Sequence, residues 1–402
     1  MICVHNSFFT PDGLVSDENR LRNQIYETIK PYVTNGVARR ASNLLEALRV
    51  ECWSPPLPVY QDRIFCSNGT LYQDGGFIED REFCTNRLPV RYNPDAPAPV
   101  LWLRFLSDLL DPEDIPTLQE YIGYCLIPST KGQKMLMLTG RGGEGKSRIG
   151  LVLRALLGDN MNTGSIAKVE TNPFARADLE HQLLMVDDDM KLEALPQTNH
   201  LKAIITAELP LDLEKKGRQS YQGQMYMRFL GMGNGTLQSR NDRSVGFFRR
   251  QIILTVRERD RNRVDDPFIA EKMCQEAEGI LLWALDGLRR LMAHSFQFTL
   301  SLKAQENMRD AAAEGVNVMD FLESDGYIRF QADSEASSRH LYAVYRQWCE
   351  DNAANCLSAR NFGSWLKQNA RVYGLEYTNK IHIGGGRCVR GFTGIRLLQP
   401  AV

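Results

Sequence analysis

The residues with the most specific chemistry form one short loop, Gly140-Arg-Gly-Gly-Glu-Gly-Lys-Ser147. Its spacing matches the P-loop pattern, in which glycines let backbone N–H groups turn inward around the phosphates of a nucleotide. The Lys146 ammonium is expected to reach the β- and γ-phosphates, and the Ser147 hydroxyl to bind Mg²⁺. The predicted ATP contacts are the eight loop residues Gly140, Arg141, Gly142, Gly143, Glu144, Gly145, Lys146 and Ser147.

The segments on both sides of this loop favour a P-loop over a chance glycine turn. Met135–Thr139 is an apolar run suited to a buried strand, and residues 148–157 have a helical pattern that ends at Gly158. A helix that begins at the loop directs its positive end at the phosphates. The sequence therefore predicts ATP and Mg²⁺ as cofactors.

Three acidic residues follow the next apolar run, Leu183–Val186. A buried strand there would deliver carboxylates beside the P-loop, where one holds Mg²⁺ and a neighbour orients the attacking water. We assign Asp187 to the metal and Asp188 to the water, with Asp189 allowing the register to shift by one residue. A solvated acidic turn is the alternative interpretation.

Two further polar features downstream complete the candidate catalytic set. Asn234 follows the apolar run Met227–Met232 and is placed to sense the γ-phosphate, although an Asn in a glycine-rich turn can be a turn residue only. Arg249 and Arg250 precede the run Gln251–Val256. Such arginines can simply line the surface, but we favour an arginine finger that reaches a neighbouring subunit's nucleotide, and the sequence does not say which of the two arginines it is.

The elements that must position these residues alternate as strand, loop and helix from residue 134 to about 256, which predicts an α/β core. A helical pattern covers Glu18–Val50, another runs from Leu101 to Leu126, and a long helix is expected over Pro267–Ala293. Near the C-terminus, two helical patterns precede two strand-like runs separated by Gly384-Gly385-Gly386. That order is typical of a winged helix. The helices are expected over Ser337–Asn352 and Ser358–Ala370, and the strands over Leu375–Ile383 and Arg387–Leu397.

Composition narrows the class of protein further. The 402 residues have 43% hydrophobic and 24% charged residues, an ordinary globular composition that favours two to four domains. No apolar run reaches the roughly 18 residues of a membrane span, no export signal is visible, and the nine cysteines stand singly, so we expect a cytoplasmic protein without a zinc site. The net charge of −1 hides two basic blocks, residues 202–263 and 357–402, which fit either a polyanion or solvated surface.

With these motifs in place, the chain resembles superfamily 3 helicases of the phage, plasmid and poxvirus primase-helicase group. The resemblance rests on the order of P-loop, acidic strand end, basic segment, Asn-tipped strand and Phe-Phe-Arg-Arg, and it extends over residues 60 to 400. Outside the ATP site it is carried by Thr85-Asn-Arg-Leu-Pro-Val-Arg-Tyr-Asn-Pro94, Glu278-Gly-Ile-Leu-Leu-Trp-Ala-Leu-Asp-Gly287 and Tyr342-Ala-Val-Tyr-Arg-Gln-Trp-Cys349. It implies an AAA+-like ATPase over residues 131–298, preceded by an α+β region (1–98) and a helical collar (99–130), and followed by a winged-helix domain (299–402).

The resemblance also implies a hexameric ring that threads single-stranded DNA and translocates in the 3′-to-5′ direction. It further implies that the segment Thr206–Gly217 leads into a hairpin whose cations Lys215, Lys216 and Arg218 contact the DNA backbone. Cations bind the phosphates of DNA without recognising its base sequence. In the winged helix, Arg360 and Lys367 are expected on the exposed face of a recognition helix, and Arg387 and Arg390 beside the wing. Their expected partner is origin or fork DNA, with a protein partner as the alternative.

Three positions depart from the family's pattern. Glu144 stands where the family commonly has Asn, Ala207-Glu208-Leu209 replaces Gly-Gly-Asp, and Asp187-Asp188 replaces Ser/Asp-Glu. The first 100 residues hold no convincing primase carboxylates, so a primase is expected to be encoded separately or in a longer product. We therefore hypothesise a replicative DNA helicase of a phage, prophage or mobile element. The alternatives are an origin-melting or helicase-loading ATPase and a P-loop regulatory or defence switch.

Overall fold

The computed structural model describes residues 1–398 except 16, 191–194, 218, 238, 240–244, 260–264, 355 and 384–386. Arg218, a predicted DNA contact, and the expected wing tip at 384–386 lie outside the described residues. None of the described helices is both long and apolar enough to cross a membrane.

A five-stranded parallel sheet forms the centre of the molecule, in the order β13-β7-β12-β9-β8. It confirms the α/β core and the four strands expected from apolar runs; β8 was not predicted. The carboxyl ends of parallel strands share one edge, so the segments after β7, β9 and β12 meet there. The strands are β7 (Met135–Thr139), β8 (Met161–Thr163), β9 (Leu184–Asp187), β12 (Arg228–Gly233) and β13 (Gln251–Thr255).

One face of the sheet packs against five helices, whose apolar side chains share a single core with it. The Tyr121 hydroxyl donates to the Phe229 carbonyl at 2.6 Å, which fixes the 99–130 segment to the sheet. The helices are α3 (Val100–Leu109), α4 (Ile115–Tyr124), α5 (Ser147–Leu157), α10 (Ile269–Cys274) and α11 (Ala277–Ala293).

The single helix predicted over 267–293 was wrong, because the chain forms α10 and α11 instead. The carboxylate of Glu276, between the two, accepts hydrogen bonds from the backbone N–H groups of Leu101 and Trp102, each at 3.0 Å. It thereby caps the exposed donors at the start of α3. The break also lets α10 pack on α5 while α11 packs on α4.

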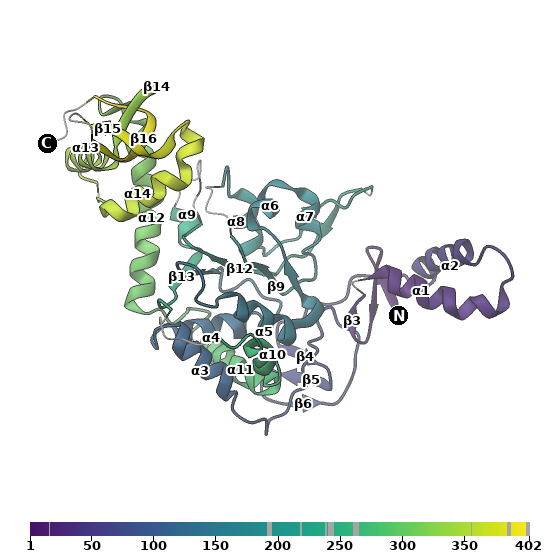
Figure 1. The fold of residues 1–402 in the computed structure, drawn as a ribbon. Coiled ribbons are helices and arrows are strands. Elements are labelled where there is room, and N and C mark those ends of the chain that lie inside the picture. The colour runs from purple at the N-terminus through teal and green to yellow at the C-terminus, as the bar shows by residue number, and fades with distance from the viewer. Residues whose placement is uncertain are drawn as a thin grey trace.

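The other face of the sheet holds a second apolar core, to which Met137, Phe229 and Ile253 contribute. Its covering elements include the first part of a long helix, α12, which reaches on into the C-terminal unit (Figure 1). Asn307 of α12 donates to the Ile253 carbonyl at 3.2 Å. These elements are α6 (Ile166–Thr171), α7 (Pro173–Ala177), α8 (Asn199–Ile205), the hairpin β10 (Leu211–Leu213) and β11 (Tyr221–Gly223), α9 (Val245–Phe248), and α12 (Leu302–Glu323). The 3-10 turn η2 (Gly158–Asn160) connects α5 to β8.

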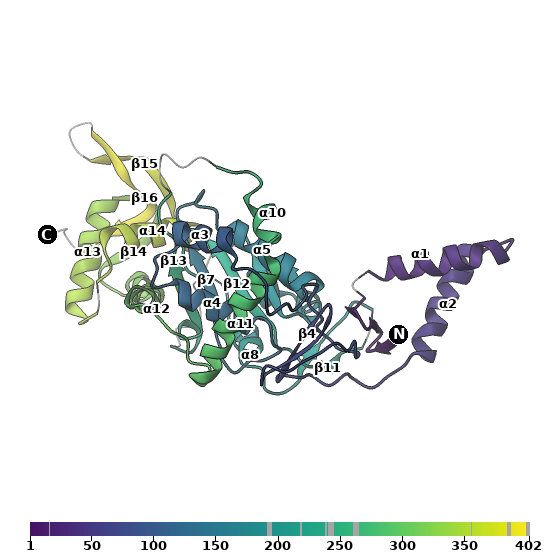
Figure 2. The same cartoon turned by 90° about the horizontal axis from the view of Figure 1, so that it is seen from below.

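The N-terminal residues form two small antiparallel sheets joined by a helical hairpin that projects away from the core (Figures 1 and 2). The continuous helical pattern expected over 18–50 is interrupted by a 3-10 turn and by Gly36, whose φ of 69° is left-handed. The elements are β1 (Ile2–Val4), β2 (Ser7–Thr10), β3 (Gly13–Leu14), α1 (Glu18–Ile29), η1 (Lys30–Tyr32), α2 (Val37–Glu51), β4 (Arg63–Cys66), β5 (Gly69–Tyr72) and β6 (Phe77–Ile78).

The C-terminal unit places helices against an antiparallel sheet of order β14-β16-β15 and lies on the opposite side of the core from the N-terminal hairpin (Figure 2). Phe362, Trp365 and Leu366 are buried, as predicted. Neither helix α12 nor strand β14 was predicted. Strand β14 is largely exposed and has no alternating apolar pattern. The elements after α12 are β14 (Ile328–Ser337), α13 (Ser338–Asp351), α14 (Ala359–Asn369), η3 (Ala370–Tyr373), β15 (Glu376–Ile383) and β16 (Arg387–Leu397).

Candidate nucleotide-binding site

The predicted P-loop connects β7 to α5 at the carboxyl edge of the central sheet. Gly142, Gly143 and Gly145 have φ values of 104°, 84° and 106°, a region that L side chains disfavour. At Gly140 a Cβ atom would lie 2.5 Å from Val256 Cγ2 and 2.8 Å from Lys146 Nζ. Both observations show that the glycines are needed for the loop to close tightly over its own lysine.

A cavity of about 690 Å³ opens beside this loop. Residues 142–148 form one wall, and Asp188, Asp189 and Asn234 from the ends of β9 and β12 form another. A third wall comes from Arg259 and residues 265–269, which the sequence analysis did not single out. The structure therefore brings the P-loop, two of the three predicted acidic positions and the predicted phosphate-sensing Asn together around one space.

Asp187 is buried, unlike its two acidic neighbours. Its side chain is buried at the end of β9, and its Oδ2 accepts a hydrogen bond from the Ile166 N–H at 2.8 Å. Burial raises the pKa of Asp187, and the charges of Asp189 and Asp188 raise it further. Asp188 and Asp189 are exposed to the cavity. Of the three, Asp188 and Asp189 are thus immediately available to a metal–nucleotide complex.

Asn234 stands beside the P-loop. The strands β12 and β7 pair through Gly233 and Thr139, and Gly140 N–H donates to the Gly233 carbonyl at 3.1 Å. A Cβ on Gly142 would lie 3.9 Å from Asn234 Oδ1. The amide is consequently within reach of a phosphate held by the loop, as its predicted role requires.

Glu144 is the departure from the family pattern with the clearest structural effect. Its Oε2 lies 2.8 Å from Lys146 Nζ, and its Oε1 accepts from the N–H groups of Arg141 and Gly142, the latter at 2.8 Å. Burial alone would raise the pKa of the Glu144 carboxyl, but the hydrogen bond from Lys146 and the backbone hydrogen bonds lower it overall. The carboxylate therefore remains charged inside the anion-binding loop.

Arg249 and Arg250 lie at the far edge of the sheet from the P-loop. Arg250 directly precedes β13, and its carbonyl accepts from the N–H of Met135 at the start of β7. The five residues of β7 separate this point from Gly140, about 16 Å of extended chain. Arg249 is exposed, whereas a guanidinium nitrogen of Arg250 donates to the Gly246 carbonyl. Neither arginine is placed to reach the nucleotide of its own chain.

The predicted DNA-contacting cations on the hairpin between β10 and β11 differ from each other. Lys215 Nζ lies 3.1 Å from the buried Glu180 carboxylate and 5.2 Å from the ring centroid of Tyr221, whose hydroxyl also donates to Glu180. Lys216 is exposed at the turn. Only Lys216 of this pair presents its charge openly to a polyanion, and Tyr221 packs within the hairpin rather than standing free to stack on a base.

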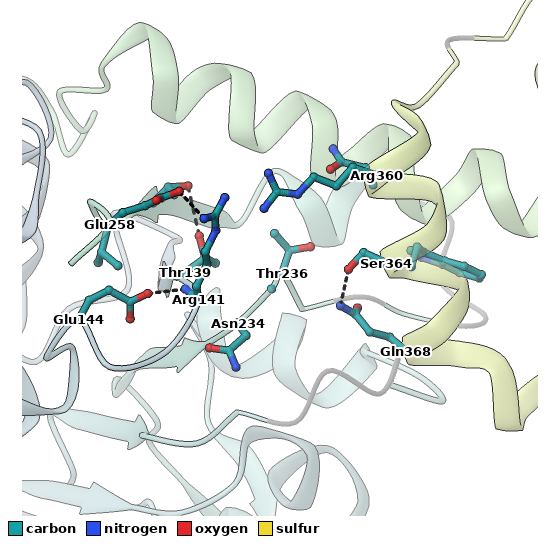
Figure 3. Close-up of a pocket in the computed structure, with 15 residues that line it drawn as sticks. Thr139, Arg141, Glu144, Asn234, Thr236, Glu258, Arg360, Ser364 and Gln368 are labelled. Atoms are coloured by element: carbon teal, nitrogen blue, oxygen red, sulfur yellow. Dashed lines mark hydrogen bonds and ion pairs between the residues drawn. The ribbon is translucent and has the colours of Figure 1, made fainter. Parts of the chain in front are cut away.

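The predicted recognition helix α14 faces the P-loop across a second cavity of about 380 Å³ (Figure 3). Arg360 lines this cavity. Lys367 is exposed, and its Nζ lies 4.0 Å from the centroid of the Tyr377 ring. Arg390 is exposed on β16, and the side chain of Arg387 is outside the described residues. Of the predicted cations of this unit whose side chains are described, Arg360 lines the cavity, and Lys367 and Arg390 do not.

The 690 Å³ cavity fits a nucleotide with its metal ion. The positive-φ glycines turn the loop's N–H groups inward, Lys146 supplies a cation, and the Ser147 hydroxyl and the Asp188 and Asp189 carboxylates provide the oxygen ligands that Mg²⁺ prefers. The sheet, loop and acidic strand end together define a P-loop ATPase core.

Two family matches fall on the chain. Residues 138–250 match "Family of unknown function (DUF5906)", and residues 317–386 match "Poxvirus D5 protein-like". They confirm the resemblance to superfamily 3 helicases of the phage, plasmid and poxvirus primase-helicase group.

Among solved structures, the chain is similar to "The A form apo structure of NrS-1 C terminal region-CTR", with 11% identity and a TM-score of 0.49 over 98% of this chain and 95% of that one. A second solved structure, "The A form apo structure of NrS-1 C terminal region-CTR(305-718)", gives 11% identity and a TM-score of 0.46 over 94% of this chain and 90% of that one.

Proposed function

We propose that this chain is an ATP-dependent DNA helicase that works as a ring, hexameric by its family resemblance, and moves along single-stranded DNA in the 3′-to-5′ direction. The observation that carries the proposal is the convergence of the P-loop, Asp188 and Asn234 on one cavity. When bound, Mg²⁺ neutralises charge on the phosphates. Lys146 binds the β- and γ-phosphates, an acidic residue after β9 orients the attacking water, and Asn234 fixes the γ-phosphate end.

The position of the arginine pair supports assembly into a ring. Because Arg249 and Arg250 lie at the sheet edge remote from their own P-loop, a catalytic role for either requires a nucleotide held by a neighbouring subunit. Arg249 is the better candidate for the finger, since it is exposed while Arg250 bonds the Gly246 carbonyl. Arg250 then positions the turn that carries Arg249.

The C-terminal unit supports a DNA-binding role beside the motor. Helix α12, strand β14, helices α13 and α14, and strands β15 and β16 follow one another in the order of a winged helix, with the wing expected at 384–386. Lys367 and Arg390, which are both exposed, are predicted contacts of this unit with origin or fork DNA. A separately encoded primase is a further expected partner.

ATP turnover with and without single-stranded DNA tests the proposal, using wild type, Lys146→Ala and Arg249→Ala with the oligomeric mass measured in parallel. A helicase shows turnover that rises with DNA, is lost in Lys146→Ala, and is lost in Arg249→Ala without loss of the ring. ATP turnover that does not change with DNA would contradict the helicase function and favour a nucleotide-driven switch. If DNA stimulates turnover but a long fork is never unwound, the chain is an origin-melting or helicase-loading ATPase.

A further inference from the structure

One polar face of α14 is turned toward the P-loop. Arg360, Ser364 and Gln368 recur every four residues, so they lie on the same side of the helix, and all three line the 380 Å³ cavity (Figure 3). Phe362 and Leu366 lie on the buried side in the core of the C-terminal unit. The facing wall of the cavity comes from Gly140, Arg141 and Glu144 of the P-loop, and from residues 234–236 after β12.

Arg360 is the charged group of α14 in this cavity. Among the described residues its guanidinium has no hydrogen-bond or ion-pair partner, and it points across the cavity toward the P-loop side (Figure 3). Arg141, on the opposite wall, is paired with Glu258 at 2.6 Å. An unpaired guanidinium is a strong donor for phosphate oxygens, which it can bind in a bidentate manner. The cavity therefore has an anion-binding group that no side chain of the described residues satisfies.

The two cavities are neighbours, because Glu144 and Asn234 line both. The part of ATP nearest to Asn234 is expected to be its terminal phosphate, which ADP lacks. In this arrangement the anion that Arg360 can reach is a phosphate of the nucleotide.

We propose that Arg360 is a nucleotide-sensing residue that binds the γ-phosphate of ATP held by the P-loop of the same chain. This inference rests on the proposed ATPase function. ATP, but not ADP, then draws α14 against the P-loop, so each hydrolysis event releases the C-terminal unit from the motor core. The family resemblance assigned Arg360 to DNA, and the sensing role replaces that assignment for this residue.

Calorimetric titration of the full chain with ADP and with a non-hydrolysable ATP analogue tests the proposal. Arg360→Ala should weaken binding of the ATP analogue by about tenfold and leave ADP binding unchanged, because one charge-assisted contact is lost only from the triphosphate. Arg360→Lys should recover part of the loss. Arg371→Ala, which removes an exposed charge from the same unit outside both cavities, is the matched control and should behave as wild type.

Hydrogen exchange of residues 359–369 gives a second readout that a general loss of stability does not mimic. The ATP analogue should slow exchange of α14 in wild type, ADP should not, and Arg360→Ala should remove the difference. Equal affinities of wild type and Arg360→Ala for the ATP analogue overturn the proposal, as does a loss confined to DNA affinity. Failure of wild type to bind either nucleotide overturns the ATPase function itself, a distinct result.

Discussion

The Nζ atom of Lys146 lies 2.8 Å from Oε2 of Glu144, so the P-loop lysine is already paired with a carboxylate of its own loop. The other carboxylate oxygen accepts from the N–H groups of Arg141 and Gly142. These donors and the lysine are the groups that a nucleotide phosphate uses in a P-loop. The Glu144 carboxylate thus occupies the same hydrogen-bond donors that a nucleotide phosphate would use.

Replacing Glu144 by Gln should tighten ATP binding by about tenfold, because the neutral amide competes less strongly than a carboxylate for Lys146 and the backbone donors. The dissociation constant from a fluorescent-nucleotide titration measures the effect. Glu306→Gln, which neutralises an exposed carboxylate on α12, is the control and should leave affinity unchanged. Weaker ATP binding by Glu144→Gln would instead mean that the carboxylate is needed to shape the loop.

The placement of Arg249 away from its own P-loop predicts complementation between two inactive variants. Arg249→Ala alone should retain ATP binding and lose turnover by about a thousandfold, the usual contribution of an arginine finger. Lys146→Ala alone should bind no ATP. Mixed rings juxtapose the intact P-loop of one variant with the intact finger of the other, so turnover should return on mixing. A mixture as inactive as its components, with mixed rings demonstrated by mass, argues against a finger in trans.

Much of the ATP site could be predicted because its signals are local. The P-loop spacing, the apolar run before it and the helix after it place Gly140 to Ser147 without any tertiary information, and β7 and α5 have nearly the predicted bounds. The acidic residues and Asn234 were identified because they directly follow apolar runs. Parallel strands then bring them to one edge.

The features that the sequence did not reveal depend on long-range contacts. Helices α10 and α11 are separate because the Glu276 side chain caps α3, some 175 residues earlier in the chain. The ion pair between Lys215 and Glu180 joins residues that are 35 positions apart in the sequence. Arg360 was predicted on the exposed face of a recognition helix, but only the tertiary structure shows that it lies with Ser364 and Gln368 opposite the P-loop.

Lys216 should contribute more to DNA binding than Lys215. Lys216 is exposed, whereas Lys215 neutralises the buried Glu180. For Lys216→Ala, the slope of log affinity for single-stranded DNA against log salt should fall in magnitude by about 1, the loss of one phosphate contact. Lys215→Ala should mainly lower thermal stability, because it leaves the Glu180 carboxylate without one of its cations. A larger change in salt slope for Lys215→Ala would mean that DNA displaces Glu180.

His181 makes the contact between the N-terminal strands and the core sensitive to pH. Burial is the largest cause that lowers the pKa of His181, and together with the charges of Lys215 and His5 it brings the pKa to about 4 against the attraction of Glu180. The ring packs edge-on against Phe9 of β2, with centroids 5.3 Å apart. The unfolded chain binds a proton at this His below its ordinary pKa of 6.5 while the folded chain stays neutral, so stability must fall as the pH drops from 6.5 toward 4.

Urea denaturation at about pH 7.5 and about pH 5 measures this loss in the free energy of unfolding. The lowered pKa of His181 sets an upper bound of about 2 kcal/mol on the loss. The lowered pKa of Glu180 does not contribute in this window, because its effect begins only below its ordinary value of 4.5. His181→Asn should lose much less stability between the two conditions, since Asn is neutral and tolerates the φ of 66° at this position. His200→Asn, at an exposed histidine, should retain the wild-type loss. An equal loss in His181→Asn would assign the acid sensitivity to other groups.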